Sequence, residues 1–274
     1  MSSRDEQAIA DAAPGAIDAA AAEAIRRGTE VVVTAAEREI ARSLTGSACA
    51  GEDGNALQQR IAEERDSGEE RPLAIGVLLS GSGTNLQALI DAIAAGELDA
   101  EIKLVVASRP SAYGLKRAEA AGIQTLTLSR EMYADPLQAD EIIAAELLRA
   151  GVDYVVMAGY MRMVHAPLLA TFKNRVVNIH PALLPSFQGA HGIEDAYNRG
   201  VKVTGVTVHF ANEVYDQGPI IAQEIVRIEE GMSLEELESG IHAVEHVLYP
   251  SVVQLLAEGR VRVTPSNTVD ILPL

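Results

Sequence analysis

The feature that most constrains the fold is a regular alternation that begins at residue 73. Apolar runs of strand length alternate with amphipathic segments of helix length as far as residue 179. Continuous apolar strands separated by helices are typical of a parallel sheet that is covered on both faces. The sequence therefore predicts an α/β fold with a doubly wound, mostly parallel sheet.

The expected elements can be given by residue range. Strands are expected at 73–79, 103–107, 124–128, 153–157 and 175–179, with helices between them at 85–95, 113–121, 140–149 and 167–173. A helix at 193–198, strands at 205–210 and 220–227, a long helix at 233–257 and a short strand at 260–263 follow. Ser233 and Glu236 have the spacing of a capping box, which predicts where the long helix begins.

Residues 1–71 differ from the rest of the chain, because they are rich in Ala, Glu, Asp and Arg. Helical patterns occur at 17–27 and 35–44, and a β-branched patch occurs at 31–33. Residues 63–71 are nearly all charged and read as a linker. We therefore predict an Ala/Glu-rich, partly helical or disordered N-terminal extension over 1–71, a folded domain over 72–265, and a tail over 266–274.

Charge and cysteine content limit the classes of partner. The net charge of −17 and the pI near 4.7 argue against nucleic acid or an anionic membrane, which select basic surfaces. Cys49 is the single cysteine, so neither an intrachain disulfide nor a cysteine-based zinc site is expected. The chain lacks a signal-peptide pattern and an apolar run of about 18 residues. A cytoplasmic protein that acts on small molecules is the expectation.

A small-residue loop, Ser80-Gly-Ser-Gly-Thr-Asn85, lies between the first predicted strand and helix. Its glycines let backbone N–H groups approach an anion, and a helix start adds positive charge. A Walker loop requires a Lys after its last glycine, and this loop has none. The dinucleotide fingerprint requires an acidic residue at the end of the second strand, where this chain has Ser108 and Arg109. The loop predicts a phosphate site, with a tight turn and helix cap as the alternative.

Asn178 and His180 end a predicted strand, and their spacing points both side chains to the same face. The loops after residues 79 and 157 reach the same edge of a parallel sheet, where ligands bind. Asp216, in a polar loop, is a candidate partner for His180. A structural histidine and a turn-forming aspartate are the alternatives. Without metal-type spacing or a nucleophile motif, the residues favour direct transfer between two bound substrates, with an amide and an imidazole stabilising an oxyanion.

Four motifs together resemble a known family. They are SGSGTNLQALID at 80–91, MAGYMRMV at 157–164, NIHPALLPSF at 178–187 and YDQGPII at 215–221. In this order, over residues 73–263, they resemble the phosphoribosylglycinamide formyltransferases, the folate-dependent glycinamide ribonucleotide transformylases of purine synthesis. The resemblance implies a Rossmann-like formyltransferase fold. It also implies transfer of a formyl group from 10-formyltetrahydrofolate, as co-substrate, to the amine of glycinamide ribonucleotide, with no metal.

The resemblance also implies roles for single residues. Asn178, His180 and Asp216 match the family's catalytic residues: Asn178 would hold the formyl oxygen, His180 would stabilise the oxyanion, and Asp216 would raise the pKa of the imidazole. The remaining matches are a substrate-phosphate loop at Gly83, Thr84 and Asn85 with His191 nearby, Glu245 as the contact to the substrate amine, and folate-pocket walls at Met161, Arg162, Met163, Val164, Asn178, Asn212, Glu213, Val214, Tyr215 and Asp216.

Departures and rivals define the alternatives. Pro136 stands where some family members carry a folate-contacting Arg, and Arg130 is a nearby substitute. Formyltetrahydrofolate hydrolase shares the fold, but residues 1–71 do not resemble its βαββαβ domain. Methionyl-tRNA formyltransferase carries a tRNA-binding C-terminal domain, and the acidic charge opposes RNA. A catalytically inactive folate- or nucleotide-binding module is the alternative from another class. The sequence leaves a choice between a monomer and a homodimer.

Overall fold

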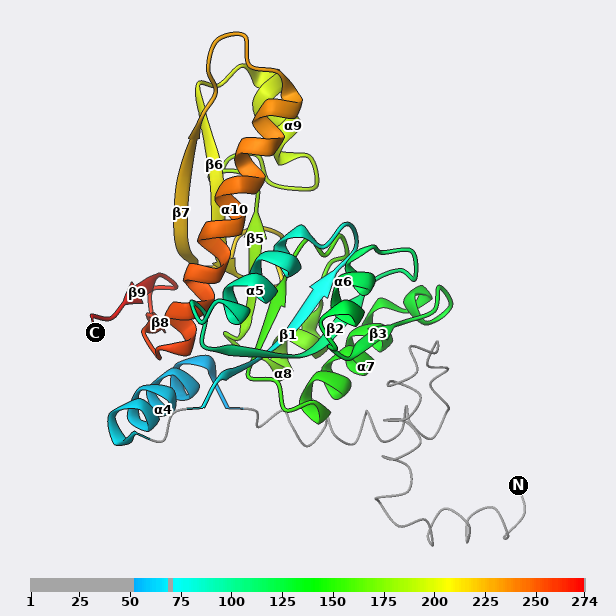
Figure 1. Ribbon diagram of the computed structural model, residues 1–274, viewed down its shortest axis with the longest axis vertical. Coiled ribbons are helices and arrows are strands. Elements are labelled where there is room, and N and C mark those ends of the chain that lie inside the picture. The colour runs from blue at the N-terminus through cyan, green and yellow to red at the C-terminus, as the bar shows by residue number, and fades with distance from the viewer. Residues whose placement is uncertain (1–51, 69–70, 274) are drawn as a thin grey trace, which may run out of the picture.

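Figure 1 shows the computed structural model, which describes residues 52–68 and 71–273. The helical patterns at 17–27 and 35–44, the patch at 31–33 and Cys49 lie outside the described residues. Among the described residues, no helix combines the length and the apolar character that crossing a membrane requires.

The centre of the fold is a seven-stranded sheet with the order β3-β2-β1-β4-β5-β6-β7. Its strands are β1 Leu73–Leu79, β2 Ala100–Ala107, β3 Thr125–Thr127, β4 Tyr154–Met157, β5 Val176–His180, β6 Val203–Phe210 and β7 Ile220–Arg227. The pairs from β3 to β5 are parallel, and the β5–β6 and β6–β7 pairs are antiparallel. The predicted mostly parallel sheet is confirmed.

Helices cover both faces of the sheet (Figure 1). They are α5 Thr84–Ala94, α6 Gly114–Ala120, α7 Pro136–Arg149, α8 Ala166–Thr171, α9 Gly192–Arg199 and α10 Leu234–Ala257, with a short 3-10 turn, η1 Met132–Ala134. Alternate residues of β1 serve two cores: Val77 packs in the core that includes α5 and α10, and Leu78 packs in the core that includes α7 and α8. All residues of β1 are buried, which explains its continuous apolar sequence.

Two helix starts follow from capping side chains. The predicted capping box is present, because the Ser233 hydroxyl accepts from Glu236 N–H and the Glu236 carboxylate accepts from Ser233 N–H. Helix α7 begins four residues earlier than expected, because the Asp135 carboxylate accepts from two backbone N–H groups and Pro136 occupies the first helical position. Pro136 is therefore the start of a helix.

Residues 63–67 are not a linker, because they form the end of helix α4, Gly54–Ser67. The amide of Asn55 donates to Val263 O at 2.7 Å and accepts from Val263 N–H at 2.9 Å. Gln58 bonds in the same way to Leu256 O and Val261 N–H. These amides thus pair with the backbone of strand β8, Val261–Val263, and of the last turn of α10. Helix α4 therefore packs with the folded domain, although its residues are part of the predicted extension.

The predicted C-terminal tail also contains regular structure. Strand β9, Val269–Ile271, pairs antiparallel with β8 and forms a second, two-stranded sheet. A strand of three residues gives only a weak period in the sequence, which explains why β9 was not predicted.

Replacing Leu57 by alanine should lower the free energy of unfolding by about 2–5 kcal/mol, the usual range for truncating a fully buried leucine. Leu57 is 0% exposed and belongs to the core under β1. Urea denaturation of the full chain measures the change. Gln59→Ala on the exposed face of α4 is the control and should change little. Equal stabilities for Leu57→Ala and the wild type would contradict the packing of α4.

Candidate active site

A cavity of about 290 Å³ lies at the carboxyl ends of β1, β4 and β5. The loops after β1 and β4, the end of β5 and helix α10 line it, together with Arg109 after β2. Carboxyl ends of parallel strands are where ligands bind in open α/β sheets. The prediction that these three strand ends meet on one face is confirmed.

The loop at residues 80–85 offers hydrogen-bond donors to this cavity. In the described part of the chain, the backbone N–H groups of residues 81–85 have no acceptor, whereas every carbonyl from Ser80 to Gly83 accepts a hydrogen bond. Gly83 has φ +71°, and a Cβ there would lie 2.6 Å from the Cα of Gly114. Only glycine fits this position, and free N–H groups at a helix start suit an anion such as phosphate.

The predicted catalytic residues lie together behind this loop. Asn178 and His180 come from β5, and Asp216 comes from the loop between β6 and β7. His180 is 3% exposed, and its Nδ1 lies 3.4 Å from Asp216 Oδ2. Its Nε2 lies 2.8 Å from Phe187 O, and because a carbonyl can only accept, we assign a proton to Nε2. Neutral His180 therefore leaves Nδ1 unprotonated beside a carboxylate.

Burial and charge act on His180 in opposite directions. Burial, the largest effect, lowers the pKa of His180, while the Asp216 carboxylate and the Phe187 carbonyl raise it. The net pKa lies below the ordinary histidine value, so the expected effect of Asp216 is present but smaller than desolvation. Burial also acts to raise the pKa of Asp216, but the His209 imidazole, the Gly189 N–H and the charge of His180 outweigh it. The pKa of Asp216 is lowered, which keeps its carboxylate ionised.

A direct prediction concerns the titration of His180. Its pKa, measured by NMR on histidine-labelled protein, should lie below that of a histidine in an unfolded peptide. Asp216→Asn removes a charge that raises this pKa and should lower it further, whereas Glu194→Gln, at an exposed position, should not change it. Because the unfolded chain accepts this proton first, the His180 contribution to stability should fall as the pH drops through the unfolded value. An increase of the pKa in Asp216→Asn would refute this account.

His209 is a buried residue of the site that the sequence did not single out. It lies opposite Asn178 in the β5–β6 register, and its Nε2 is 3.2 Å from Asn178 Nδ2. Its Nδ1 lies 2.9 Å from Phe210 O, so we assign the proton to Nδ1 and let Nε2 accept from the Asn178 amide. This bond fixes the amide and leaves its second N–H for a ligand. A lone histidine within the apolar strand β6 was the available signal.

Glu245 and Asn85 form a second polar pair in the cavity. Asn85 Nδ2 donates to Glu245 Oε2 at 3.0 Å, and Asn85 Oδ1 is buried without a partner in the described residues. Burial raises the pKa of Glu245, against the hydrogen bond from Asn85 and the charge of His242. The unpartnered Asn85 Oδ1 and the Glu245 carboxylate can both accept hydrogen bonds from an amine. His242, which the sequence did not single out, lines the same cavity.

The residues predicted for folate are divided between two places. Met161 lines the main cavity. A narrow recess beside it is lined by Arg162, Met163, Val164, Asn178, Asn212, Val214, Tyr215 and Asp216. Asn178 and Tyr215 border both spaces, so the recess adjoins the cavity. Glu213 and Arg130 line neither space.

His191 is not brought into the cavity. Its side chain is exposed, and its Nδ1 lies 3.4 Å from Glu194 Oε2 on the surface. It directly precedes helix α9, whose first residue, Gly192, is buried close to His180. The sequence position is therefore near the site, but the backbone turns the imidazole outward.

Comparisons with known proteins agree with this geometry. Residues 73–253 match the formyl transferase family. The chain is 38% identical over 180 residues to the phosphoribosylglycinamide formyltransferase of Bacillus subtilis. This alignment covers 66% of the chain and 92% of the Bacillus protein. It is 36% identical over 217 residues to the trifunctional purine biosynthetic protein adenosine-3 of Homo sapiens. That match covers 79% of the chain but 22% of the human protein, so the chain spans about a fifth of this relative's length.

Solved structures give the same result. The glycinamide ribonucleotide transformylase 1 of Symbiobacterium toebii superposes with a TM-score of 0.71 at 44% identity, over 74% of the chain and 95% of that structure. A formyltetrahydrofolate deformylase of Pseudomonas syringae superposes with a TM-score of 0.68 at 27% identity, over 74% of the chain and 67% of that structure. The motifs, the sheet and the cavity agree with these matches, and the chain belongs to the formyl transferase family.

Proposed function

We propose that the chain transfers the formyl group of 10-formyltetrahydrofolate to the amine of glycinamide ribonucleotide, a step of purine biosynthesis. The main support is that one cavity joins a donor-rich loop suited to phosphate, the acceptor pair Asn85 and Glu245, and the side chains of Asn178 and His180. Asp216 lies next to His180, in the adjoining recess. A ribonucleotide that carries a phosphate at one end and an amine at the other matches this order of groups. The chain aligns with 92% of the Bacillus subtilis formyltransferase and 95% of the Symbiobacterium toebii transformylase, two relatives named for this reaction.

The proposed chemistry is a direct transfer. The amine nitrogen of the acceptor attacks the formyl carbon, and the carbonyl electron pair moves to the oxygen. The free N–H of Asn178 is a donor that can stabilise that oxyanion, and the N–H at Nε2 of His180 joins it by exchanging Phe187 O for the oxyanion. When the bond from carbon to the folate nitrogen breaks, that nitrogen takes up one proton and the acceptor amine loses one. His180 Nδ1, beside Asp216, is placed to hold this proton between the two steps.

The recess lined by residues 162–164, 211, 212 and 214–216, with the apolar side chains around it, supports binding of the folate ring. Met161, Met163, Val214 and Tyr215 are between 43% and 62% exposed, a high exposure for large apolar side chains. Apolar groups that remain exposed together beside a cavity commonly mark a binding surface. The Arg162 guanidinium lies 3.7 Å from the centre of the Tyr133 ring, which fixes one wall of the recess. We assign the folate donor to this side and the ribonucleotide to the loop at 80–85.

The rival functions are a deformylase and an inactive binding module. In a deformylase the acceptor is water, which has no phosphate to bind the free N–H groups of residues 81–85 and no amine to bind the Asn85–Glu245 pair. The deformylase structure also has the lower sequence identity to the chain, 27% against 44%. Intact Asn178, His180 and Asp216 oppose loss of activity. The acidic composition supports an enzyme of small molecules that binds neither nucleic acid nor an anionic membrane. A cytoplasmic location, and a monomer or a homodimer, complete the proposal.

A turnover assay separates these functions. The purified chain is mixed with 10-formyltetrahydrofolate, with and without glycinamide ribonucleotide, and the deformylated folate is followed by absorbance. Turnover that requires the acceptor is the expected result. Turnover without the acceptor would identify a deformylase, and folate binding without any turnover would identify a binding module.

A further inference from the structure

Two arginines hold the outer side of the loop at residues 80–85. Arg109, directly after β2, donates from Nε to Ser80 O at 2.6 Å. Arg117, on α6, donates from Nε to Ser82 O at 2.9 Å and from Nη1 to Gln87 Oε1 at 3.0 Å. Gly114 N–H donates to the carbonyl between them, Gly81 O. The loop carbonyls are therefore bonded to the segment at 109–117.

This arrangement determines which groups face the cavity. With the carbonyls of Ser80, Gly81 and Ser82 bonded on the outer side, the N–H groups of residues 81–85 stay without an acceptor in the described residues. Consecutive free N–H groups form a concavity that binds anions. A loop without these bonds could turn a carbonyl toward the ligand, and a carbonyl repels an anion. The arginines thus select the orientation of the loop.

The same arginines contribute positive charge in a chain of net charge −17. Among the described residues, neither guanidinium makes an ion pair with a carboxylate, and Arg109 keeps both terminal amino groups without a partner at the cavity rim. Unpaired cations beside free N–H groups favour a doubly charged anion over a singly charged or neutral one. Bidentate donors of this kind fit phosphate oxygens better than an ammonium group does.

We propose that Arg109 and Arg117 form a two-sided guanidinium brace that makes the loop at 80–85 selective for a dianionic phosphate monoester. The proposal rests on the proposed function, because it names the group that decides which acceptor the site takes. Arg117 acts through the loop and is a positioning residue, whereas Arg109 also reaches the cavity.

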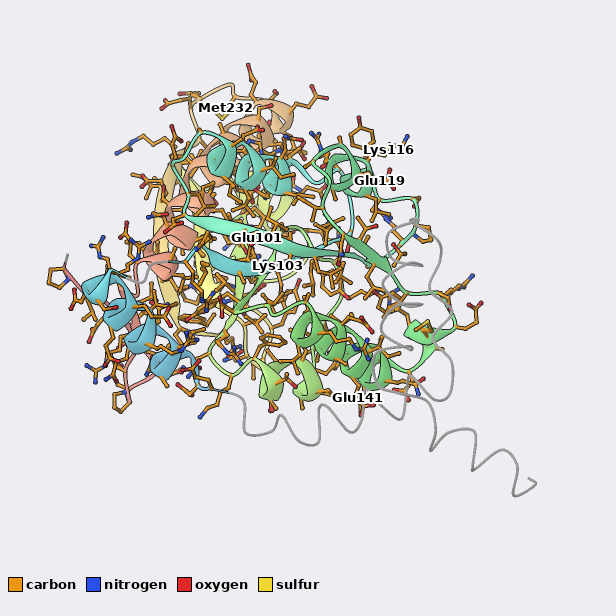
Figure 2. All side chains as sticks on the ribbon, turned by 60° about the horizontal axis from the view of Figure 1, so that its bottom comes forward. Glu101, Lys103, Lys116, Glu119, Glu141 and Met232 are labelled. Carbon is orange, nitrogen blue, oxygen red and sulfur yellow. The ribbon has the colours of Figure 1, made fainter. Side chains whose placement is uncertain are left out.

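The test compares Arg109→Gln and Arg117→Gln with Lys116→Gln. Lys116 neighbours Arg117 on α6 and is exposed (Figure 2). Within the described ranges, the interaction of its Nζ is a contact with the Tyr113 ring at 5.6 Å. All three variants lose one positive charge, but only the arginine variants lose a bond to the loop. Each arginine variant should raise the KM for the phosphorylated acceptor about 10- to 100-fold, the effect of losing one charge-assisted hydrogen bond. The KM for the folate should stay near the wild-type value.

Two further measurements isolate the brace. Arg117→Lys keeps the charge but loses the Nε donor, so its KM should lie between those of the wild type and Arg117→Gln. Inorganic phosphate should inhibit the wild type and Lys116→Gln competitively against the acceptor, and the arginine variants at least several-fold more weakly. Thermal unfolding verifies that each variant is folded.

The outcomes separate the brace from the proposed function. A wild-type KM in Arg109→Gln and Arg117→Gln, or an equal rise in Lys116→Gln, would overturn the brace while formyl transfer still stands. Absence of transfer by the wild type would overturn the proposed function. In that case calorimetric titration with inorganic phosphate still decides whether the arginines create an anion site.

Discussion

Replacing His180 by alanine should lower kcat by about two to four orders of magnitude, the usual contribution of a positioned acid–base group. The variant loses the N–H at Nε2, which can exchange Phe187 O for the oxyanion, and the nitrogen beside Asp216, which can hold the proton. The KM values for both substrates should change little, because the loop at 80–85 and the folate recess keep their walls. Steady-state kinetics with each substrate varied in turn measure both effects.

His191→Ala is the matched control for His180→Ala. It removes the same side chain eleven residues away, at an exposed position outside the cavity. Its kcat should stay within about twofold of the wild type, as expected for a surface substitution. Near-normal kcat in a folded His180→Ala protein would remove the role assigned to His180, and a large loss in His191→Ala would show that the imidazole turns inward when substrate binds.

Asp216→Asn should lower kcat by about 100-fold or more. The substitution keeps the size of the side chain but removes the negative charge that faces His180 at 3.4 Å and His209 at 3.7 Å. Without this charge, a proton held at His180 Nδ1 is less stable, so the step that collects the proton from the amine becomes slower. Asp195→Asn, on the exposed side of α9, is the control and should be close to wild type.

A double variant tests whether His180 and Asp216 act as a unit. Residues that share one catalytic task give strongly non-additive losses. His180→Ala combined with Asp216→Asn should therefore be about as slow as His180→Ala alone. Losses that multiply would mean that Asp216 acts on the substrates independently of His180.

The sequence predicted the parts of the molecule that depend on local periodicity. Strand β1 was located to the residue, because every position is apolar and a polar loop follows it. The capping pair Ser233 and Glu236 located the start of α10 for the same local reason. The spacing of Asn178 and His180 was sufficient to predict that both face the ligand edge, since alternation along a strand is fixed by backbone geometry.

The parts that were not predicted depend on contacts between distant segments. Helix α4 is held in part by the amides of Asn55 and Gln58, whose partners lie about 200 residues away in sequence, and such bonds have no period. Arg109 and Arg117 look like ordinary surface cations until the fold brings the carbonyls of Ser80 and Ser82 to them. The pKa of His180 could not be derived in sign from the sequence, because burial competes with the Asp216 charge.

The position of helix α4 determines where the polypeptide can be lengthened. Gly54 N–H donates to Lys173 O, just before β5 begins, whereas His180 is the last residue of that strand, about 13 Å from its first residue at the usual rise per residue. A protein fused before Glu52, or a solid support attached there, would therefore join the domain at the pole opposite the cavity. An attachment point at Glu52 would thus lie near the amino end of β5, whereas the cavity lies at the carboxyl end of that strand.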